Sequence, residues 1–370
     1  MAKPKKKKVV DYGLLVVVFV LIIVGLYILY STSAYNGRVK FDDEFYYLKK
    51  QVFATALGIG CMYAMANIDY HIWQKFAVWA YVVSLALSLA VLFVGDEYNG
   101  SKRWLSFGPL SFQPSEFAKL AVILFLANLI VKKGKKMKKM GTLLVIMISI
   151  LPIVGLVGAG NLSTAIIILG IGVVLVFVAS PLYAQFVWLG VSAVGFMAIF
   201  LAMESYRLER LAIWRNPEAY EKGYQTLQGL YAIGSGGLFG RGSGESIQKL
   251  GFVPEAQNDM IFAIVCEEWG LFGAAILIFL FLFLIWRFFV IAVNAKDLFG
   301  SLIASGAMAH MMIQVILNIG GVIKFIPSTG VTLPLVSYGL SSVLSTLIIF
   351  NIVQGVYIIE NKEAKKIEKA

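Results

Sequence analysis

The sequence predicts an all-α integral membrane protein, with about ten transmembrane helices in a single polytopic domain, residues 1–370. Hydrophobic residues make up 59% of the chain, charged residues make up 14%, and the mean hydropathy is +0.81. A soluble domain has about a quarter charged residues, so a water-soluble fold with this composition would have too little polar surface to cover itself. The apolar residues also occur in runs long enough to cross a bilayer, which predicts a multi-span helical protein.

The apolar runs that predict transmembrane helices have roughly the length that a bilayer requires. No small-residue cleavage site follows the first run, so we expect a retained helix rather than a signal peptide. One long hydrophilic connection, residues 204–260, is expected to form a structured loop between helices 7 and 8. The candidate spans are roughly residues 12–32, 50–68, 73–94, 117–131, 142–158, 162–180, 184–203, 269–292, 298–322 and 339–359.

The distribution of lysine and arginine predicts that both termini are cytoplasmic. With the amino terminus inside, the inside segments carry more than twice as many basic residues as the short outside loops, as the positive-inside rule requires. The loops 204–260, 95–116 and 323–338 then lie outside, so we expect the outer face to be the working surface. The basic runs are interpreted as topology signals that contact anionic lipids, and no nucleic acid is expected as a partner.

The long outer loop contains a predicted helix and a glycine-rich run. Asn216-Pro-Glu218 is typical of a helix start, and Tyr224 and Tyr231 follow at helical spacing, which predicts an amphipathic helix at the membrane surface. The run 234–244 lacks the glycine spacing of a dinucleotide or Walker motif, so nucleotide binding is excluded. Its glycines could cradle a phosphate with backbone amides, or could only allow the chain to turn sharply.

Asp259 is the last polar residue before a long hydrophobic run, and two interpretations are open. The carboxylate could cap the following helix and interact with its dipole. Alternatively, it could act as a base for sugar chemistry, because acids and cations crowd the same region. The acids are Glu255, Glu267 and Glu268, and the cations that precede Asp259 are Arg207, Arg210, Arg241 and Lys249.

Two further polar clusters lie near the outer boundary. Arg103 and Trp104 could be interfacial anchors, whereas Glu116 and Lys119 share a helix face at membrane depth, where a charged pair is costly and is either functional or a structural ion pair. Two prolines and several glycines in 324–342 predict a broken segment that is buried or lines a cavity. His310, in mid-span, could relay protons or pack through a hydrogen bond.

These clusters occur together in an order that resembles the SEDS family, the FtsW and RodA proteins. The runs that carry the resemblance cover essentially the whole chain, and 249–263 with 330–338 is more similar to the division-type FtsW branch than to RodA, although a sporulation paralogue would look similar. The sequence departs from the family at Asn161, which replaces an acid, and at Leu340, which replaces a glycine. The matching runs are 102–119, 223–225, 233–242, 254–268 and 318–342.

The resemblance implies a peptidoglycan glycosyltransferase of the bacterial cytoplasmic membrane that polymerises lipid II into β-1,4 glycan strands for septal wall synthesis. It places the catalytic acid at Asp259 and matches Arg103, Trp104 and Arg210 to the family's motifs. We expect these three residues to contact the substrate, together with Lys249, Gln257 and Ser337. Glu116 and Lys119 would position or tune the catalytic acid. No cofactor is assigned, although a divalent cation could share the diphosphate. The implied partners are lipid II, a lipid-linked glycan chain, a class B penicillin-binding protein and other divisome membrane proteins.

Forming a β link from an α-linked sugar diphosphate inverts the anomeric carbon in one displacement. This step requires a base for the attacking hydroxyl and positive charge for the leaving diphosphate, tasks that suit a carboxylate and arginines. A lipid II flippase, a RodA-type elongation polymerase and a non-catalytic scaffold are the alternatives. A flippase needs a polar path to the cytoplasm, whereas the polar groups are concentrated on the outer side.

Overall fold

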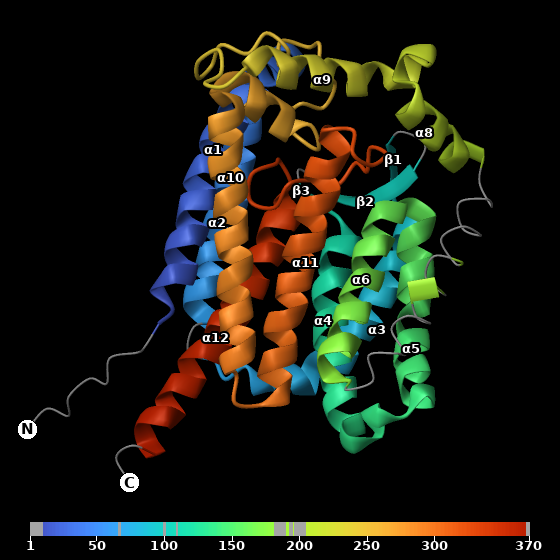
Figure 1. Ribbon diagram of the computed structural model, residues 1–370, viewed down its shortest axis with the longest axis vertical. Helices are drawn as coiled ribbons and strands as arrows, with labels where there is room; N and C mark the ends of the chain where they lie inside the picture. Colours follow the sequence, from blue (N-terminus) through green and yellow to red (C-terminus); the bar gives the residue numbers. More distant parts are fainter. Residues whose placement is uncertain are drawn as a thin grey trace, which may run out of the picture.

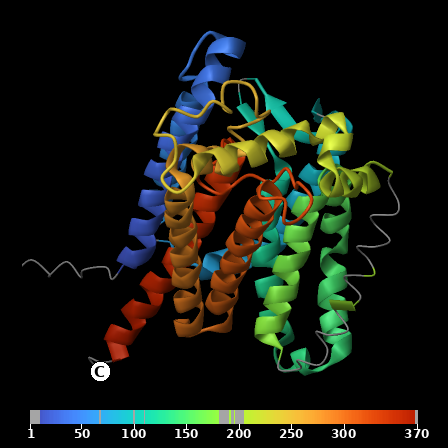
Figure 2. The same ribbon diagram turned by 45° about the horizontal axis from the view of Figure 1, so that its top comes forward.

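The computed structural model describes residues 10–65, 68–98, 101–108, 110–180 and 205–367, together with residues 190, 191 and 195. Long helices run side by side in a bundle, and α9 lies across one end of it (Figures 1 and 2). The first residues of α1 and the last residues of α12 lie toward the opposite end (Figure 1). We call the two ends of the bundle the α9 end and the terminal end.

Eight of the described helices are long and apolar enough to cross a membrane. The helix α2 (Tyr46–Met65) is less apolar but packs in the bundle against α1 and α12. Most of the predicted span 184–203 lies outside the described residues, and the expected spans 117–131 and 142–158 belong to longer helices. The eight are α1 (Tyr12–Phe41), α3 (His71–Val94), α4 (Pro114–Lys133), α5 (Met140–Gly160), α6 (Leu162–Ala179), α10 (Ile261–Asn294), α11 (Leu298–Val322) and α12 (Leu340–Ile367).

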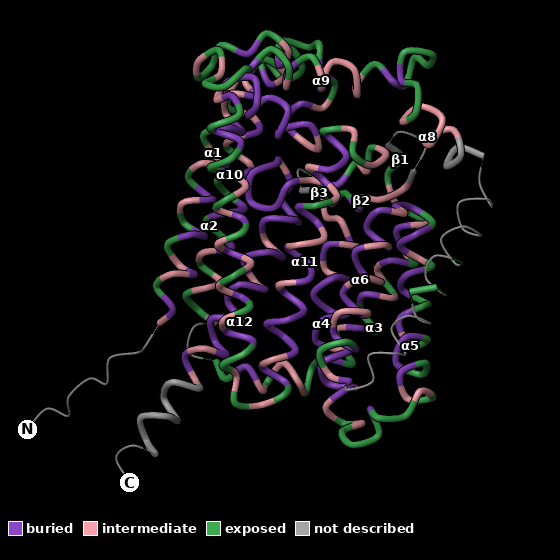
Figure 3. The backbone as a smooth tube through the Cα atoms, viewed as in Figure 1, coloured by how far each residue is buried: buried purple, intermediate pink, exposed green. Residues whose placement is uncertain are grey.

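The centre of the bundle is formed by α4, α11 and α12. Most of the apolar part of each of these helices is buried, compared with 28% of that of α3, and the buried residues concentrate in the middle of the bundle (Figure 3). The exposed faces of the outer helices are also apolar, with side chains such as Phe76, Trp79 and Phe279 more than half exposed. Such a surface suits hydrocarbon rather than water.

The helix α10 is broken at Gly270, whose φ of 67° and ψ of −168° are not helical. The glycine-rich segment crosses the break, where the amides of Leu271 and Phe272 donate to the carbonyls of Gly237 and Leu238, at 2.9 and 3.0 Å. A Cβ atom on Gly270 would lie 2.3 Å from the backbone nitrogen of Gly240, so only glycine fits this crossing. The glycines therefore allow close backbone contact, which supports the turning role rather than a phosphate cradle.

The connection between α3 and α4 forms a three-stranded antiparallel sheet, which the sequence analysis did not predict. The strands are β1 (Asp96–Tyr98), β2 (Ser101–Phe107) and β3 (Leu110–Phe112), in the order β1-β2-β3. The dipeptide Asn99-Gly100 in the sequence, which favours a tight hairpin turn, is the signal that was available.

The long loop contains α8 (Ser205–Arg215), two short 3₁₀ turns, Pro217–Ala219 and Glu221–Gly223, and α9 (Tyr224–Gly236). Asn216 precedes a 3₁₀ turn, so the expected amphipathic helix begins at Tyr224 and not at Pro217. A Cβ atom at Gly223 would lie 2.0 Å from the carbonyl oxygen of Pro217, because the chain folds back on itself there. Tyr224 and Tyr231 are exposed on α9, as the amphipathic pattern predicts.

Candidate functional site

Three segments converge on Asp259, which lies just before α10 at the α9 end of the bundle, where that helix begins (Figure 1). The residue is half-buried in the turn before α10, and the N-cap position of that helix belongs to Met260. The amide of Gln225, at the start of α9, lies 3.5 Å from Oδ1 of Asp259. A Cβ atom on Gly330 would lie 4.0 Å from Oδ2, which places the loop between α11 and α12 beside the carboxylate.

Asn318 holds the backbone on both sides of this site, and the sequence analysis did not single it out. From its buried position in α11, its Nδ2 donates to the carbonyl of Asp259 at 2.8 Å and to the carbonyl of Val331 at 2.7 Å. The side chain thereby joins the turn that carries Asp259 to the loop that faces its carboxylate. The available signal was a polar stripe on an apolar helix, because His310, Gln314 and Asn318 recur every four residues.

Glu116 and Lys119 form an ion pair in the centre of the bundle, as their spacing predicted. The Nζ of Lys119 lies 2.8 Å from Oε1 of Glu116, and both side chains are almost fully buried. The same ammonium donates to Oε1 of Gln314 at 2.8 Å, and Nε2 of His310 lies 2.8 Å from the same oxygen. An amide oxygen only accepts, so Nε2 of His310 carries a proton, which supports its packing role.

The buried pair and the Asp259 turn are connected through adjacent residues of one loop. Gln314 accepts from Lys119 through its oxygen, and its Nε2 donates to the carbonyl of Thr332 at 3.0 Å. Asn318, one helical turn further along α11, donates to the neighbouring carbonyl of Val331. The polar face of α11 therefore fixes the Val331-Thr332 backbone against both groups. Hydrogen bonds thus connect the ion pair with the backbone that faces Asp259.

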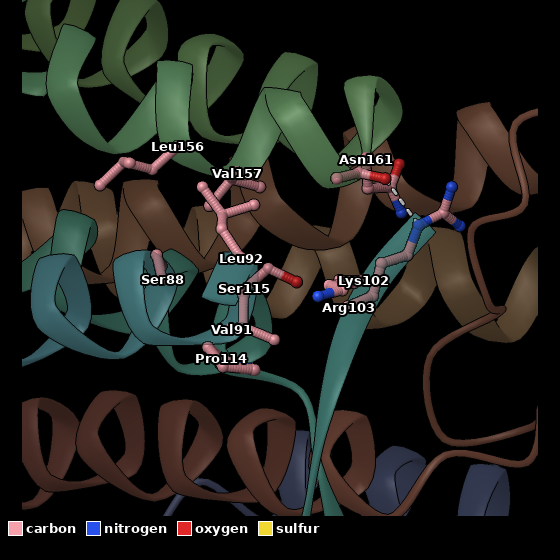
Figure 4. Close-up of a pocket in the computed structure, with 11 residues that line it drawn as sticks. Ser88, Val91, Leu92, Lys102, Arg103, Pro114, Ser115, Leu156, Val157 and Asn161 are labelled. Atoms are coloured by element: carbon pink, nitrogen blue, oxygen red, sulfur yellow. Dashed lines mark hydrogen bonds between the residues drawn. The ribbon is translucent and has the colours of Figure 1, made fainter. Parts of the chain in front are cut away.

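Arg103 extends from β2 to the end of α5, where its Nε donates to the carbonyl of Gly160 at 2.6 Å (Figure 4). The hollow beside it, shared with Lys102, Ser115 and Asn161, has a volume of about 20 Å³, which is room for about one water molecule. Trp104 is half-buried and opposes Asp96 in the sheet. Asn161 caps α6, because its side chain accepts from the amide of Thr164.

Lys249 is buried in an ion pair. Its Nζ lies 2.7 Å from Oε1 of Glu268, 2.9 Å from Oγ of Ser31 and 2.7 Å from the carbonyl of Gly244. An ammonium has three donors, so binding a diphosphate here would require Lys249 to leave one of these partners. Arg241 lies 3.8 Å from Glu267, so two of the cations expected around Asp259 pair with the acids that follow it.

Gln257 and Ser337 are buried and make contacts within the protein. The oxygen of Gln257 accepts from Asn36 at 2.9 Å, and its carbonyl accepts from the amide of Tyr338 at 2.9 Å. The hydroxyl of Ser337 accepts from the amide of Leu333 at 2.8 Å. Burial raises the pKa of the Tyr338 phenol, so this group stays protonated at neutral pH.

Of the residues that the sequence placed at the site, Arg210 lies in α8, but its side chain is outside the described part of the structure, as is that of Arg207. No group of residues suited to a metal ion is found among the described residues. The segment 323–339 is not helical, as its prolines and glycines predicted, and α12 begins at the buried residue Leu340. The described geometry thus supplies a half-buried carboxylate, its backbone support and a buried ion pair behind it.

Comparison with known proteins identifies relatives along nearly the whole chain. The chain is 38% identical over 358 residues to stage V sporulation protein E of Bacillus subtilis, an alignment that covers 95% of this chain and 98% of the relative. It is 33% identical over 362 residues to a probable peptidoglycan glycosyltransferase FtsW of Saccharophagus degradans, covering 95% and 94%.

Solved structures agree with this relationship. One chain, from work described as the structural coordination of polymerization and crosslinking by a peptidoglycan synthase complex, has a TM-score of 0.79 and 29% identity, and the match covers 95% of this chain and 98% of that one. The rod shape determining protein RodA of Thermus thermophilus has a TM-score of 0.69 and 29% identity, covering 94% and 96%. The family model described as a cell cycle protein and named for FtsW, RodA and SpoVE matches residues 12–362. The chain therefore belongs to the FtsW/RodA/SpoVE family, the SEDS family of membrane proteins.

Proposed function

We propose that this protein is a peptidoglycan glycosyltransferase that polymerises lipid II into β-1,4 glycan strands at the outer face of the cytoplasmic membrane. The relatives named as glycosyltransferases support the reaction class. The observation that carries the proposal is the half-buried carboxylate of Asp259, whose backbone is held by Asn318 between α9, α10 and the loop before α12. A carboxylate in such a position is suited to act as a general base.

In the proposed reaction, Asp259 takes the proton from the 4-hydroxyl of the acceptor sugar. The hydroxyl oxygen attacks the anomeric carbon of the donor from the face opposite the diphosphate, and the bond to the diphosphate oxygen breaks with its electron pair. The anomeric centre is inverted in this single displacement. Arg103 and Arg210 would bind the departing diphosphate, because guanidinium groups contact phosphate oxygens in pairs. Trp104, Gln257 and Ser337 would contribute to the substrate site, and Glu116 with Lys119 would position Asp259.

The relatives also support a role in wall synthesis with a partner enzyme. The neighbour with the TM-score of 0.79 comes from a complex that couples polymerisation with crosslinking, so we propose that a class B penicillin-binding protein is the partner. We propose septal synthesis as the cellular role. The sporulation protein among the relatives makes wall synthesis during sporulation the alternative role. Depletion during vegetative growth separates the two, since only loss of a septal enzyme should block division there.

The decisive experiment is polymerisation of purified lipid II by the purified protein, with and without the partner. Replacing Asp259 with asparagine should lower the rate about 10²- to 10⁴-fold, the usual contribution of a general base. Asp42→Asn is a matched control, because Asp42 is exposed and its left-handed backbone (φ 55°) also suits asparagine. Normal polymerisation by Asp259→Asn would reject the base assignment, and movement of lipid without any polymer would favour a flippase.

A further inference from the structure

A second hollow opens at the α9 end, away from the contacts of Asp259. Its volume is about 440 Å³, within the range of small-molecule sites. The second half of α9 forms one side through Leu230, Tyr231 and Ser235, and the segment from Arg241 to Gln248 forms much of the rest. Tyr231 is 56% exposed, so an aromatic ring lies accessible at this hollow.

The charged and polar groups of the hollow suit a carboxylate and an amide. Arg241 is partly exposed, and its Nε lies 3.8 Å from Glu267; no hydrogen bond of the guanidinium is found among the described residues. Glu267 already accepts from the hydroxyl of Ser246 and from the amides of Ile247 and Gln248. Arg241 therefore retains donors for a second anion, and arginine binds carboxylates in pairs of hydrogen bonds.

The remaining groups match a peptide rather than an inorganic anion. Oε1 of Gln248 is closed to solvent and has no hydrogen-bond partner within the described part of the chain, and a rotation of this side chain, which lines the hollow, would let it accept from a ligand N–H. Leu230 and the half-exposed Ile247 provide aliphatic surface beside it. A ligand with a carboxylate, an N–H group and small aliphatic side chains would satisfy all three features.

The hollow also lies within reach of the proposed reaction site. Gln225 contacts Asp259 at the start of α9, and the α9 residues that line the hollow follow five to ten positions later, which corresponds to about 8 to 15 Å along the helix. Lipid II carries a peptide of five residues on its sugar, and an extended chain of that length spans about 17 Å. A peptide on a sugar bound at Asp259 would therefore reach the hollow.

We propose that this hollow binds the peptide of the lipid-linked substrate, with Arg241 contacting its terminal carboxylate and Gln248 accepting from a peptide N–H. This inference rests on the proposed function, because that function supplies a substrate with a peptide. It adds a recognition site for a part of the substrate that does not react. The protein would then select wall precursors by their peptide as well as by their sugars.

A binding experiment tests the site without the reaction. The probes are two soluble N-acetylated pentapeptides with the stem sequence, one with a free terminal carboxylate and one with a terminal amide, titrated into the purified full-length protein by calorimetry. Wild type should bind the free acid at least tenfold more tightly than the amide, a difference of about 1.4 kcal/mol. Arg241→Gln should remove this difference by weakening the acid alone. Arg38→Gln, an exposed arginine paired with Glu44, should change neither affinity.

Several outcomes would overturn the proposal. Absence of binding by the free acid to wild type is one, and an equal loss for both peptides in Arg241→Gln is another, since that would indicate a structural role. A variant that loses affinity for the partner protein but keeps that for the peptide would assign the hollow to a protein contact instead. Asp259→Asn should still bind the peptide normally, so failure of the catalytic assignment and failure of the peptide site give different results.

The same site should affect polymerisation. On lipid II with its peptide, Arg241→Gln should lower kcat/KM about tenfold through KM, because the contact is with a part of the substrate that does not react. On lipid II without a peptide, the loss should shrink to less than twofold. Equal losses on both substrates would show that Arg241 does not recognise the peptide.

Discussion

Replacing Lys249 with methionine removes one partner of a buried ion pair, and its effect can be worked out from the contacts. The side chains of Lys249 and Glu268 are only 9% and 5% exposed, and their charged atoms are 2.7 Å apart. Without the ammonium, Glu268 keeps the hydroxyl of Ser31 as a donor but loses its opposite charge. Breaking a buried pair in this way typically costs about 3–5 kcal/mol.

The loss should be visible as local opening of the segment around Lys249. The amides of Arg241 and Gly242 donate to the carbonyls of Glu267 and Glu268, so their hydrogen exchange reports whether the segment stays attached to α10. A loss of 3–5 kcal/mol corresponds to exchange that is roughly 10²- to 4 × 10³-fold faster. Measured by mass spectrometry, unchanged exchange in Lys249→Met would refute the reasoning.

The double variant Lys249→Met/Glu268→Gln separates the structural role from substrate binding. It removes both charges, so most of the protection from exchange should return. If polymerisation returns as well, Lys249 acts through the ion pair. If the segment is protected but polymerisation stays lost, Lys249 contacts the substrate, as expected from the sequence.

Two further variants test the support of the site. Asn318→Leu leaves the carbonyls of Asp259 and Val331 without their donor, which costs about 1–3 kcal/mol for each acceptor. We therefore expect kcat for lipid II to fall at least tenfold with little change in KM. An unchanged kcat would show that Asp259 is positioned without Asn318. Gly270→Ala places a Cβ 2.3 Å from backbone at a left-handed position and should lower the thermal midpoint of the purified protein, whereas Gly155→Ala in α5, with open space around it, should not; equal midpoints would argue against the crossing as a source of stability.

The helices of the bundle were largely predictable from the sequence, because a helix that crosses a bilayer needs a long run of apolar residues and such runs are visible in the sequence. Their lengths were less so. The span expected at 269–292 is part of α10, which begins at Ile261. The acidic pair Glu267-Glu268 lies inside this helix, where Ser246, Ser31 and Lys249 are among the partners of the two carboxylates.

The candidate site shows the same division between local and distant information. The Glu116–Lys119 pair followed from a spacing of three residues on a helix. The link from Asn318 to Asp259 joins positions 59 residues apart, and that from Lys249 to Ser31 joins positions 218 apart. Periodicity in the sequence carries no information on such distant pairs. The sequence therefore showed that cations and acids gather in the same region of the chain, but it did not show that Arg241 pairs with Glu267 and Lys249 with Glu268.

The break at Gly270 divides α10 into two parts, of which the second has the length of a membrane span. An unbroken helix over Ile261–Asn294 would be about 51 Å long, far more than the roughly 30 Å of hydrocarbon in a bilayer. The part after the break, Leu271–Asn294, is about 36 Å long and fits that thickness with a modest tilt. The stretch that fits the bilayer therefore contains no acidic residue, and the charges of Glu267 and Glu268 before the break are paired with Arg241 and Lys249 inside the protein.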